Sequence, residues 1–371
     1  MFDKRTGRKI RKTFPTFAAA KSWRQDALPA VRKGAMAAPS RLTLREASEQ
    51  WLAGIERGDV LSRRRTPYKP SVTRGYRHDL TAYVLPEFGA LRLSEVRRAE
   101  VQLLIDELVA RKLSSSKVRN VVTPLQALYR WTRRRGLVDI DPTDDLELPE
   151  VTGSREWDGT PADVAALLAA LPEEDRALWA TAAYAGPRRG ELRALRVVDL
   201  VGLEADAEER WISVERGWDD VEGVILPKSK AGVRRTLIPE TLRVYLVAHV
   251  QRTGRSGDDL VFGRRARQPF TPGHPQDRAD KAWTEAKLER TTLQLLRHAC
   301  GSFLNAAGIA EARADRYMGH GRSTIGDRYR HALKGQLAAD AQRLDDYLNG
   351  RTGEVVAIRT RHLSPISAAS G

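Results

Sequence analysis

Residues 185–192 read Ala-Gly-Pro-Arg-Arg-Gly-Glu-Leu and stand between two stretches of helical periodicity. The pair Gly186-Pro187 ends the first helix, and the residues after it begin a second. Arg188 is therefore predicted at a helix N-terminus, where free N–H groups and the helix dipole already favour an anion. Glu191, three residues later, is placed to orient the Arg188 guanidinium. Taken alone, this stretch favours a capped helix that carries surface ions.

A second group of side chains lies on the helix predicted over residues 293–307. Its apolar residues recur at helical spacing and form one stripe, which consists of Leu293, Leu296, Cys300, Phe303 and Ala307. The lone cysteine, Cys300, is therefore predicted to be a core residue. Gln294, Arg297 and His298 stand at i, i+3 and i+4 and form a separate polar patch. On its own, this patch is interpreted as an exposed polar face.

A third group follows near the end of the chain. The sequence Met-Gly-His of residues 318–320 precedes Tyr329 by nine residues, and Tyr329 lies in the sequence Asp-Arg-Tyr-Arg-His of residues 327–331. Ser323 or Thr324 would cap the short helix that carries this tyrosine. A tyrosine on a terminal helix is most often half-buried packing, so this group too is a weak signal by itself.

Other common enzyme signatures are missing from the sequence. It has no phosphate-binding glycine-rich loop ending in Lys-Ser/Thr, no paired-histidine zinc helix and no serine in a nucleophile elbow. His298 and Cys300 are close but lack further ligands at the spacing of a metal site. We therefore expect neither a metal site nor a cofactor.

In this order and at this spacing, two arginines, a histidine and a tyrosine closely resemble the tyrosine recombinase (phage integrase) family. The resemblance rests on the motifs Gly186-x-Arg188-x-x-Glu191-Leu192, Leu296-Arg297-His298, Gly319-His320 and Tyr329-x-His331. It implies a lambda-type site-specific DNA recombinase that integrates or excises a phage or a mobile element. The implied fold is mainly α-helical with a small antiparallel β-sheet in the catalytic domain (α+β).

The family resemblance gives the central residues roles that phosphodiester chemistry explains. Arg188 and Arg297 would supply cations to the non-bridging oxygens, where negative charge builds in the transition state. Tyr329 would attack the scissile phosphate and form a 3′-phosphotyrosyl link, which conserves the bond energy for rejoining. His320 would donate a hydrogen bond to the phosphate.

Four further residues complete the predicted site. A lysine of the β-hairpin would protonate the 5′-oxygen leaving group as a general acid. Lys230 is preferred because the Lys-x-Gly-x-basic turn fits the family's hairpin, and Lys228 is the alternative because the loop length varies. Gln294 stands where the family usually has His or Lys; its amide can bond a phosphate oxygen but cannot titrate near neutral pH. Glu191 and His298 would support the site.

The composition favours a polyanionic partner. The chain has 371 residues with 63 Lys plus Arg against 48 Asp plus Glu, a net charge of +15, and 50 of these cations are Arg. The planar guanidinium suits phosphate recognition, so nucleic acid is favoured over a membrane surface. No apolar run approaches the roughly 20 residues of a membrane span, and the N-terminus lacks the apolar core of a secretory signal. A soluble, cytoplasmic and nucleoid-associated protein is predicted.

Periodicity and the family resemblance divide the chain into consecutive parts. They are a basic arm-type DNA-binding module (1–40), a helical core-binding, SAM-like domain (41–148), a linker (149–158), a catalytic domain (159–345) and a C-terminal tail (346–371). Helical spacing in the core-binding part covers residues 43–55, 71–85, 96–112 and 115–135. In the catalytic part, Thr160 and Pro161 begin a helix as N-cap and first helical residue. Short β-type runs cover residues 211–214, 223–226 and 235–238.

The first 40 residues hold ten cations and two acids, a net of +8. They are predicted to form a strand over residues 9–14 and a helix from Thr16 through Trp23; a disordered basic tail is the alternative. Arm-type modules usually begin with another strand, which the sequence does not show, so the start would be truncated or misassigned.

The resemblance also implies partners. We expect a homotetramer on double-stranded DNA at attachment sites, with a host DNA-bending factor or an excision factor as a further partner. Two alternatives share the fold or the chemistry: a non-catalytic DNA-binding protein and a type IB topoisomerase. The joint presence of Tyr329, both arginines, the hairpin lysine and His320 disfavours the first alternative. The separate basic module and the motif spacing disfavour the second.

Overall fold

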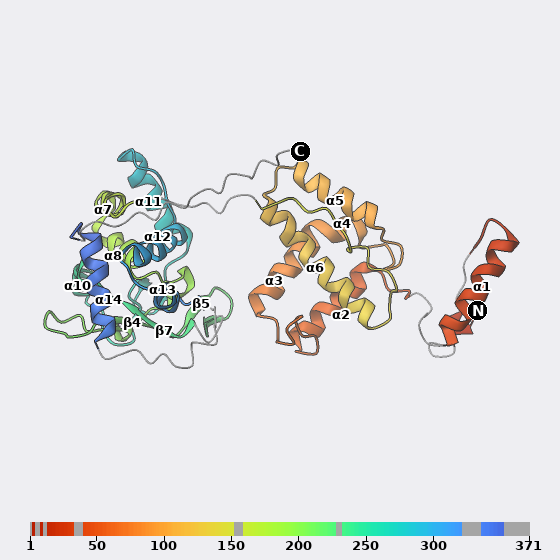
Figure 1. Ribbon diagram of the computed structural model, residues 1–371, viewed down its shortest axis with the longest axis horizontal. Helices are drawn as coiled ribbons and strands as arrows, with labels where there is room; N and C mark the ends of the chain where they lie inside the picture. Colours follow the sequence, from red (N-terminus) through yellow and green to blue (C-terminus); the bar gives the residue numbers. More distant parts are fainter. Residues whose placement is uncertain are drawn as a thin grey trace, which may run out of the picture. The chain divides into compact units, whose positions relative to one another are not determined.

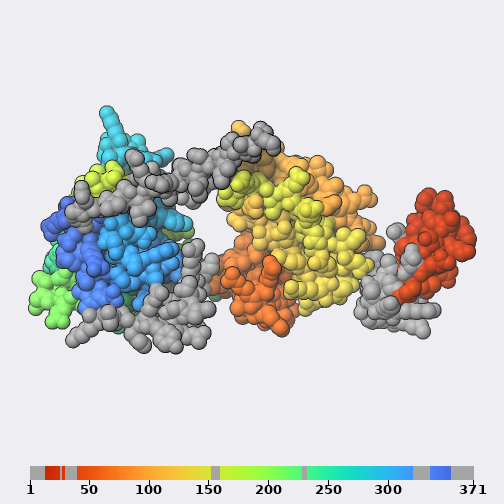
Figure 2. Space-filling model, viewed as in Figure 1, coloured from red at the N-terminus to blue at the C-terminus, as the bar shows by residue number. Residues whose placement is uncertain are grey.

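The computed structural model describes residues 2–3, 8–9, 13–32, 40–151, 159–227, 232–320 and 335–351. The chain divides into two compact units, Met1–Gly153 and Ser154–Gly371. Both are mainly helical, and the described strands pair in small antiparallel sheets, which confirms the predicted fold class (Figure 1). The helices of residues 40–151 and those of the second unit each pack into a continuous body of side chains (Figure 2). Among the described residues, no helix combines the length and the apolar character needed to cross a membrane.

The start of the chain differs in part from the sequence prediction. β1 (Phe2–Asp3) pairs antiparallel with β2 (Arg8–Lys9), so the first strand that the sequence did not show is present. Residues 13 and 14, at the end of the predicted strand, are not in a strand. Two-residue strands are too short to show the alternation from which strands are predicted. The helix α1 (Phe17–Arg32) begins where one is predicted.

The helical part of the first unit contains the predicted helices, one of them interrupted. They are α2 (Leu44–Glu56), α3 (Pro70–Asp79) continued by the π-helical turn η1 (Leu80–Val84) and α4 (Leu85–Phe88), α5 (Arg98–Ala110) and α6 (Ser115–Arg134). Pro86 explains the interruption, because proline cannot donate a helical backbone hydrogen bond and its ring displaces the preceding turn. The apolar faces enclose a core around Trp51, Leu80 and Tyr129.

The second unit surrounds small sheets with helices. Its helices are α7 (Pro161–Ala170), α8 (Glu173–Tyr184), α9 (Arg189–Ala194), η2 (Val197–Asp199), α10 (Glu240–Thr253), α11 (Gly273–Glu285), α12 (Leu293–Ala306), α13 (Glu311–Met318) and α14 (Gln336–Leu348). The largest described sheet has the strand order β3 (Leu200–Val201), β4 (Trp211–Val214), β7 (Arg234–Leu237). The hairpin of β5 (Gly217–Asp219) and β6 (Gly223–Ile225) and the pair of β8 (Gly263–Arg265) and β9 (Gln268–Pro269) are separate.

The local predictions for this unit are largely confirmed. Thr160 caps α7 by accepting the amide of Asp163, and Pro161 is the first helical residue. The β-type runs appear as β4, β6 and β7, while β3, β5, β8 and β9 were not predicted. The buried α12 packs on α8, and Trp179 meets Trp283 edge to face at 4.8 Å between ring centroids. Strand β7 lies beside α13 and α14 (Figure 1), which brings the sheet to the end of α13.

Candidate active site

The C-terminal end of α13 collects three arginines from three other elements. The carbonyl oxygens of Tyr317, Met318 and Gly319 accept hydrogen bonds from Arg234 Nε (2.7 Å), Arg297 Nη2 (2.5 Å) and Arg188 Nη2 (2.9 Å), respectively. Carbonyls of a last helical turn lack intrahelical partners and carry the negative end of the helix dipole, so they favour cations. We call Arg188, Arg234 and Arg297 the arginine cluster.

Arg188 is the N-cap residue of α9, as the break at Gly186-Pro187 predicts. Its backbone N–H donates to Glu191 Oε2 over 2.7 Å, and its Nη1 donates to Glu191 Oε1 over 3.0 Å. The Arg188 side chain is 40% exposed, whereas that of Glu191 is only 7% exposed. The buried Glu191 carboxylate therefore holds one side of the Arg188 guanidinium, while another part of it faces solvent.

Glu191 is the carboxylate shared by two members of the cluster. Burial would raise the pKa of the Glu191 carboxyl, but the hydrogen bonds and charges of Arg234 and Arg188 outweigh burial and lower this pKa below its usual value. Glu191 thus remains ionised at neutral pH, and its charge offsets only one of the three guanidinium charges.

Arg234 was not singled out by the sequence analysis. It is the first residue of β7, and its side chain is only 2% exposed. Nη1 and Nη2 donate to Glu191 Oε1 and Oε2 over 3.1 and 2.9 Å, and Nη1 also donates to the Gly232 carbonyl over 3.0 Å. The sequence does place a basic residue after the hairpin, but only the pairing of β7 puts this one on the buried face.

Arg297 lies on α12, where the sequence predicts one polar patch with Gln294 and His298. That patch is wrong in one respect: Gln294 and His298 are exposed, but Arg297 is 7% exposed and points inward. Its Nη1 donates to the Gly186 carbonyl, and its Nη2 donates to the Met318 carbonyl. These buried acceptors explain why a charged side chain leaves the polar face.

The electrostatic environment of Arg297 is strongly positive. Burial, followed by the charges of Arg188 and Arg234, lowers the pKa of Arg297 to about 10. The side chain therefore stays charged at neutral pH, although it is repelled by its neighbours. An incoming phosphate would relieve that repulsion.

His320 follows the helix end directly. Gly319 takes a left-handed conformation at φ 67°, and the His320 amide bonds the Asp315 carbonyl over 2.9 Å. The ring Nδ1 lies 3.1 Å from Asp315 Oδ1, and the side chain is 47% exposed. Burial and the charges of Arg297 and Arg188 lower the pKa of His320 despite the opposing effect of Asp315. The ring is therefore mainly neutral at pH 7.

Close packing supports the site from inside. Gly186 adopts a φ of +66°, and a Cβ there would meet Met318 Sδ at 2.7 Å and Cys300 Sγ at 3.1 Å. Cys300 is buried as predicted, and burial raises the pKa of its thiol to about 12. Cys300 is thus a core residue behind the Arg297 acceptor.

The structure brings together Arg188, Glu191, Arg297 and His320 of the predicted site, and adds Arg234. Gln294 and His298 lie exposed on α12. The predicted nucleophile Tyr329 and the hairpin lysines, Lys230 and Lys228, fall outside the described residues.

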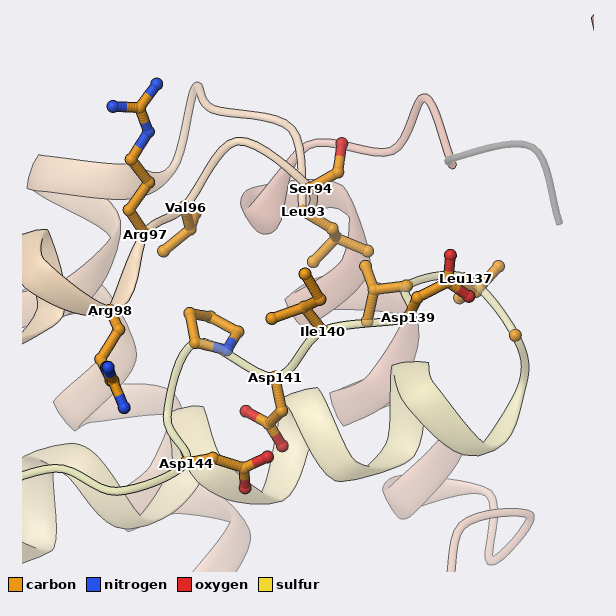
Figure 3. Close-up of a pocket in the computed structure, with 13 residues that line it drawn as sticks. Leu93, Ser94, Val96, Arg97, Arg98, Leu137, Asp139, Ile140, Asp141 and Asp144 are labelled. Carbon is orange, nitrogen blue, oxygen red and sulfur yellow. The ribbon is translucent and has the colours of Figure 1, made fainter. Parts of the chain in front are cut away.

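A pocket of about 570 Å³ in the first unit is a different kind of surface (Figure 3). Apolar Leu93, Val96 and Ile140 line it together with Asp139, Asp141 and Asp144, and with Arg97 and Arg98. Its acidic residues outnumber its basic ones, so it does not favour a phosphate as the arginine cluster does.

Comparisons with known proteins concern the second unit and the fold. Residues 160–336 match the model of the phage integrase family, while no curated protein matches the chain at a significant level. The Tn1549 transposon integrase, solved with a circular intermediate DNA, is similar with a TM-score of 0.61 at 18% identity, over 82% of this chain and 99% of that one. A lambda integrase dimer on a COC′ core site is similar with a TM-score of 0.54 at 15% identity, over 89% of this chain and 91% of that one. A lambda integrase tetramer on a Holliday junction is similar with a TM-score of 0.57 at 14% identity, over 89% of this chain and 91% of that one.

Proposed function

We propose that this chain is a site-specific recombinase of the phage integrase family, whose model covers most of its second unit, and that it cuts and rejoins double-stranded DNA through a 3′-phosphotyrosyl intermediate. The arginine cluster carries this proposal. The cluster holds three guanidinium groups, and its one bonded carboxylate, Glu191, pairs with Arg188 and Arg234, so positive charge remains for a scissile phosphate. Because the charges are fixed before DNA binds, they need little reorganisation in the transition state.

Arg188 and Arg297 keep donors for the substrate. Among the described contacts, each uses two side-chain N–H groups on protein acceptors. A guanidinium has five N–H donors, so each arginine has three that none of these contacts uses. His320 would donate a further hydrogen bond once phosphate favours its protonated ring. Gln294 would contact the phosphate from α12.

Tyr329 and a hairpin lysine would complete the reaction. The Tyr329 hydroxyl releases its proton to solvent as its Oη attacks phosphorus, the bond from phosphorus to the 5′-oxygen breaks, and that oxygen takes a proton from Lys230. Lys228 is the alternative acid. Attack of a 5′-hydroxyl on the phosphotyrosyl bond reverses the step and rejoins the strand. The family motifs around these residues support the assignments.

Exposed arginines of the first unit favour a DNA-facing surface there. The unit has three runs of consecutive arginines, at residues 63–65, 97–98 and 133–135, and Arg64, Arg97 and Arg134 are exposed members of these runs. Such cations would contact the phosphate backbone, and DNA affinity would fall steeply with salt. Residues 1–40 would bind separate arm sites, and His298 would support the catalytic helix.

Recombination between two duplexes needs several active sites. We propose a homotetramer on the paired attachment sites, in the cytoplasm and associated with the nucleoid, with the C-terminal tail docked on a neighbouring protomer. A host DNA-bending factor or an excision factor would set the direction. The tetrameric lambda integrase on a Holliday junction supports this assembly by analogy of fold.

A covalent-trapping experiment tests the proposal. The protein is incubated with a nicked suicide substrate that carries its attachment core, and denaturing gels reveal protein–DNA adducts. We expect an adduct with the wild type and none with Tyr329→Phe. An undiminished adduct with Tyr329→Phe would show that another residue is the nucleophile. No adduct with the wild type would favour the non-catalytic DNA-binding protein.

A further inference from the structure

Arg234 differs from the other members of the arginine cluster in its surroundings. Its side chain is 2% exposed, and its donors reach Glu191, the Gly232 carbonyl and the Tyr317 carbonyl. These contacts use four of the five N–H groups of the guanidinium. Arg234 therefore has little capacity left to bind DNA directly.

The contacts of Arg234 join three parts of the site. Through Glu191 it meets α9, whose N-cap is Arg188, and through Tyr317 it meets the end of α13, which leads to His320. Through Gly232 it holds the chain just after residues 228–231, a stretch that includes both candidate lysines. No other described side chain bonds all three of these elements.

Glu191 connects Arg234 to Arg188 through hydrogen bonds. Its two oxygens accept Arg234 Nη1 and Nη2 on one side and the backbone N–H and Nη1 of Arg188 on the other. Without Arg234, the buried carboxylate would keep only Arg188 as its cationic partner. With one cationic partner fewer, the Glu191 carboxylate would draw the Arg188 guanidinium toward itself and away from solvent.

We propose that Arg234 is a positioning residue for DNA cleavage: it holds Glu191 so that Arg188 presents its free donors to the scissile phosphate. The inference rests on the proposed function, because it assumes that Arg188 contacts a phosphate. It adds a residue that acts through another residue and never touches the substrate.

A phosphate analogue separates positioning from folding. In a methylphosphonate, a methyl group replaces one charged non-bridging oxygen, so the linkage has less need of an arginine to offset charge. Cleavage of matched phosphate and methylphosphonate suicide substrates is measured in single turnover at saturating protein. If Arg188 is misplaced, the cleavage rate should fall strongly on the phosphate substrate and little on the methylphosphonate substrate. A general folding defect should slow both substrates equally.

The variants are Arg234→Met, Arg188→Ala as the reference, and Arg235→Met as the control. Arg235 is the exposed neighbour of Arg234 and lies over the Trp211 ring, so its loss removes the same charge from the other face of β7. We expect Arg234→Met to slow phosphate cleavage by about 10–100-fold, in the range of lost supporting contacts. On methylphosphonate, we expect both Arg234→Met and Arg188→Ala to approach the wild-type rate.

Arg234→Met leaves a buried carboxylate with one partner and can fail to fold, so the double variant Glu191→Gln with Arg234→Met is included. It removes both charges, and the oxygen of the introduced amide can still accept a hydrogen bond from Arg188. The same phosphate-specific defect is expected from it. Equal slowing on both substrates, or full activity on phosphate, would overturn the inference. Failure of the wild type on both substrates would instead overturn the proposed function and this inference with it.

Discussion

Arg188 Nη2 donates to the carbonyl oxygen of Gly319, 131 residues later in the chain, over 2.9 Å. The bond joins the start of α9 to the residue that ends α13 and precedes His320. It means that the cation of the first motif and the histidine of the third are fixed to the same backbone turn. A change at either end of this bond should therefore alter how the site contacts the scissile phosphate.

Replacing Arg188 should remove a major source of transition-state stabilisation. We expect Arg188→Ala to lower the single-turnover cleavage rate by about 100–1000-fold, the usual cost of one preorganised donor at a developing charge. Arg189→Ala is the control, because Arg189 is the exposed neighbour; it should stay within a few-fold of the wild type. Adduct formation over time on a suicide substrate measures both rates. Similar losses for the two variants would argue against a specific role for Arg188.

Gly186 should tolerate no side chain. Gly186→Ala adds the strain of a φ of +66° and a Cβ placed 2.7 Å from Met318 Sδ. Gly254→Ala supplies the matched control, since Gly254 has a φ of +62° but nothing within 4 Å of the added Cβ. We expect a loss of unfolding free energy of about 1–2 kcal/mol at Gly254 and of about 2–5 kcal/mol at Gly186. Urea denaturation checks this difference, and equal losses would show that the contact with Met318 relaxes freely.

His320 should couple DNA binding to proton uptake. Because the pKa of His320 is lowered in the free protein, its ring is mainly neutral at pH 7.5, and a bound phosphate would favour the protonated form. Affinity for core-site DNA should therefore increase as the pH falls from 7.5 toward 5.5. Titrations across this range should show a weaker pH dependence for His320→Gln. His274→Gln, at an exposed histidine of the same unit, should follow the wild type; the same pH profile for His320→Gln would refute the coupling.

The basic segment, residues 1–40, should not be needed for DNA cleavage. Deleting residues 1–40 removes a net charge of +8 and should abolish binding to distal arm sites while sparing covalent cleavage at the core site. Gel-shift assays on arm DNA and adduct assays on core DNA report the two properties independently. Loss of core cleavage in the truncated protein would contradict a separable arm module.

Much of the fold could be predicted because its signals are local. Helical periodicity gave α2, α5 and α6 to within a few residues, and Thr160 with Pro161 marked the start of α7. Most of the very short strands at the start of the chain and in the second unit were not predicted, because two or three residues rarely show alternation. These strands depend on partners that are distant in sequence.

The candidate site divides in the same way. Its residue types and their spacing were readable, since Arg188, Arg297 and His320 stand in motifs that resemble one family. Their mutual arrangement was not, because the bonds from Arg234 to Tyr317 and from Arg297 to Gly186 span 83 and 111 residues.

Motifs and periodicity are properties of neighbouring residues, so the linear sequence was enough to indicate the resemblance to one family, most of the helices and candidate residues for handling a phosphate. By contrast, it is tertiary packing that turns Arg297 away from the polar face of α12 and brings Arg234 into the cluster. Both outcomes depend on free carbonyls at the end of α13, and these become acceptors for distant arginines only when β7, α9, α12 and α13 pack together.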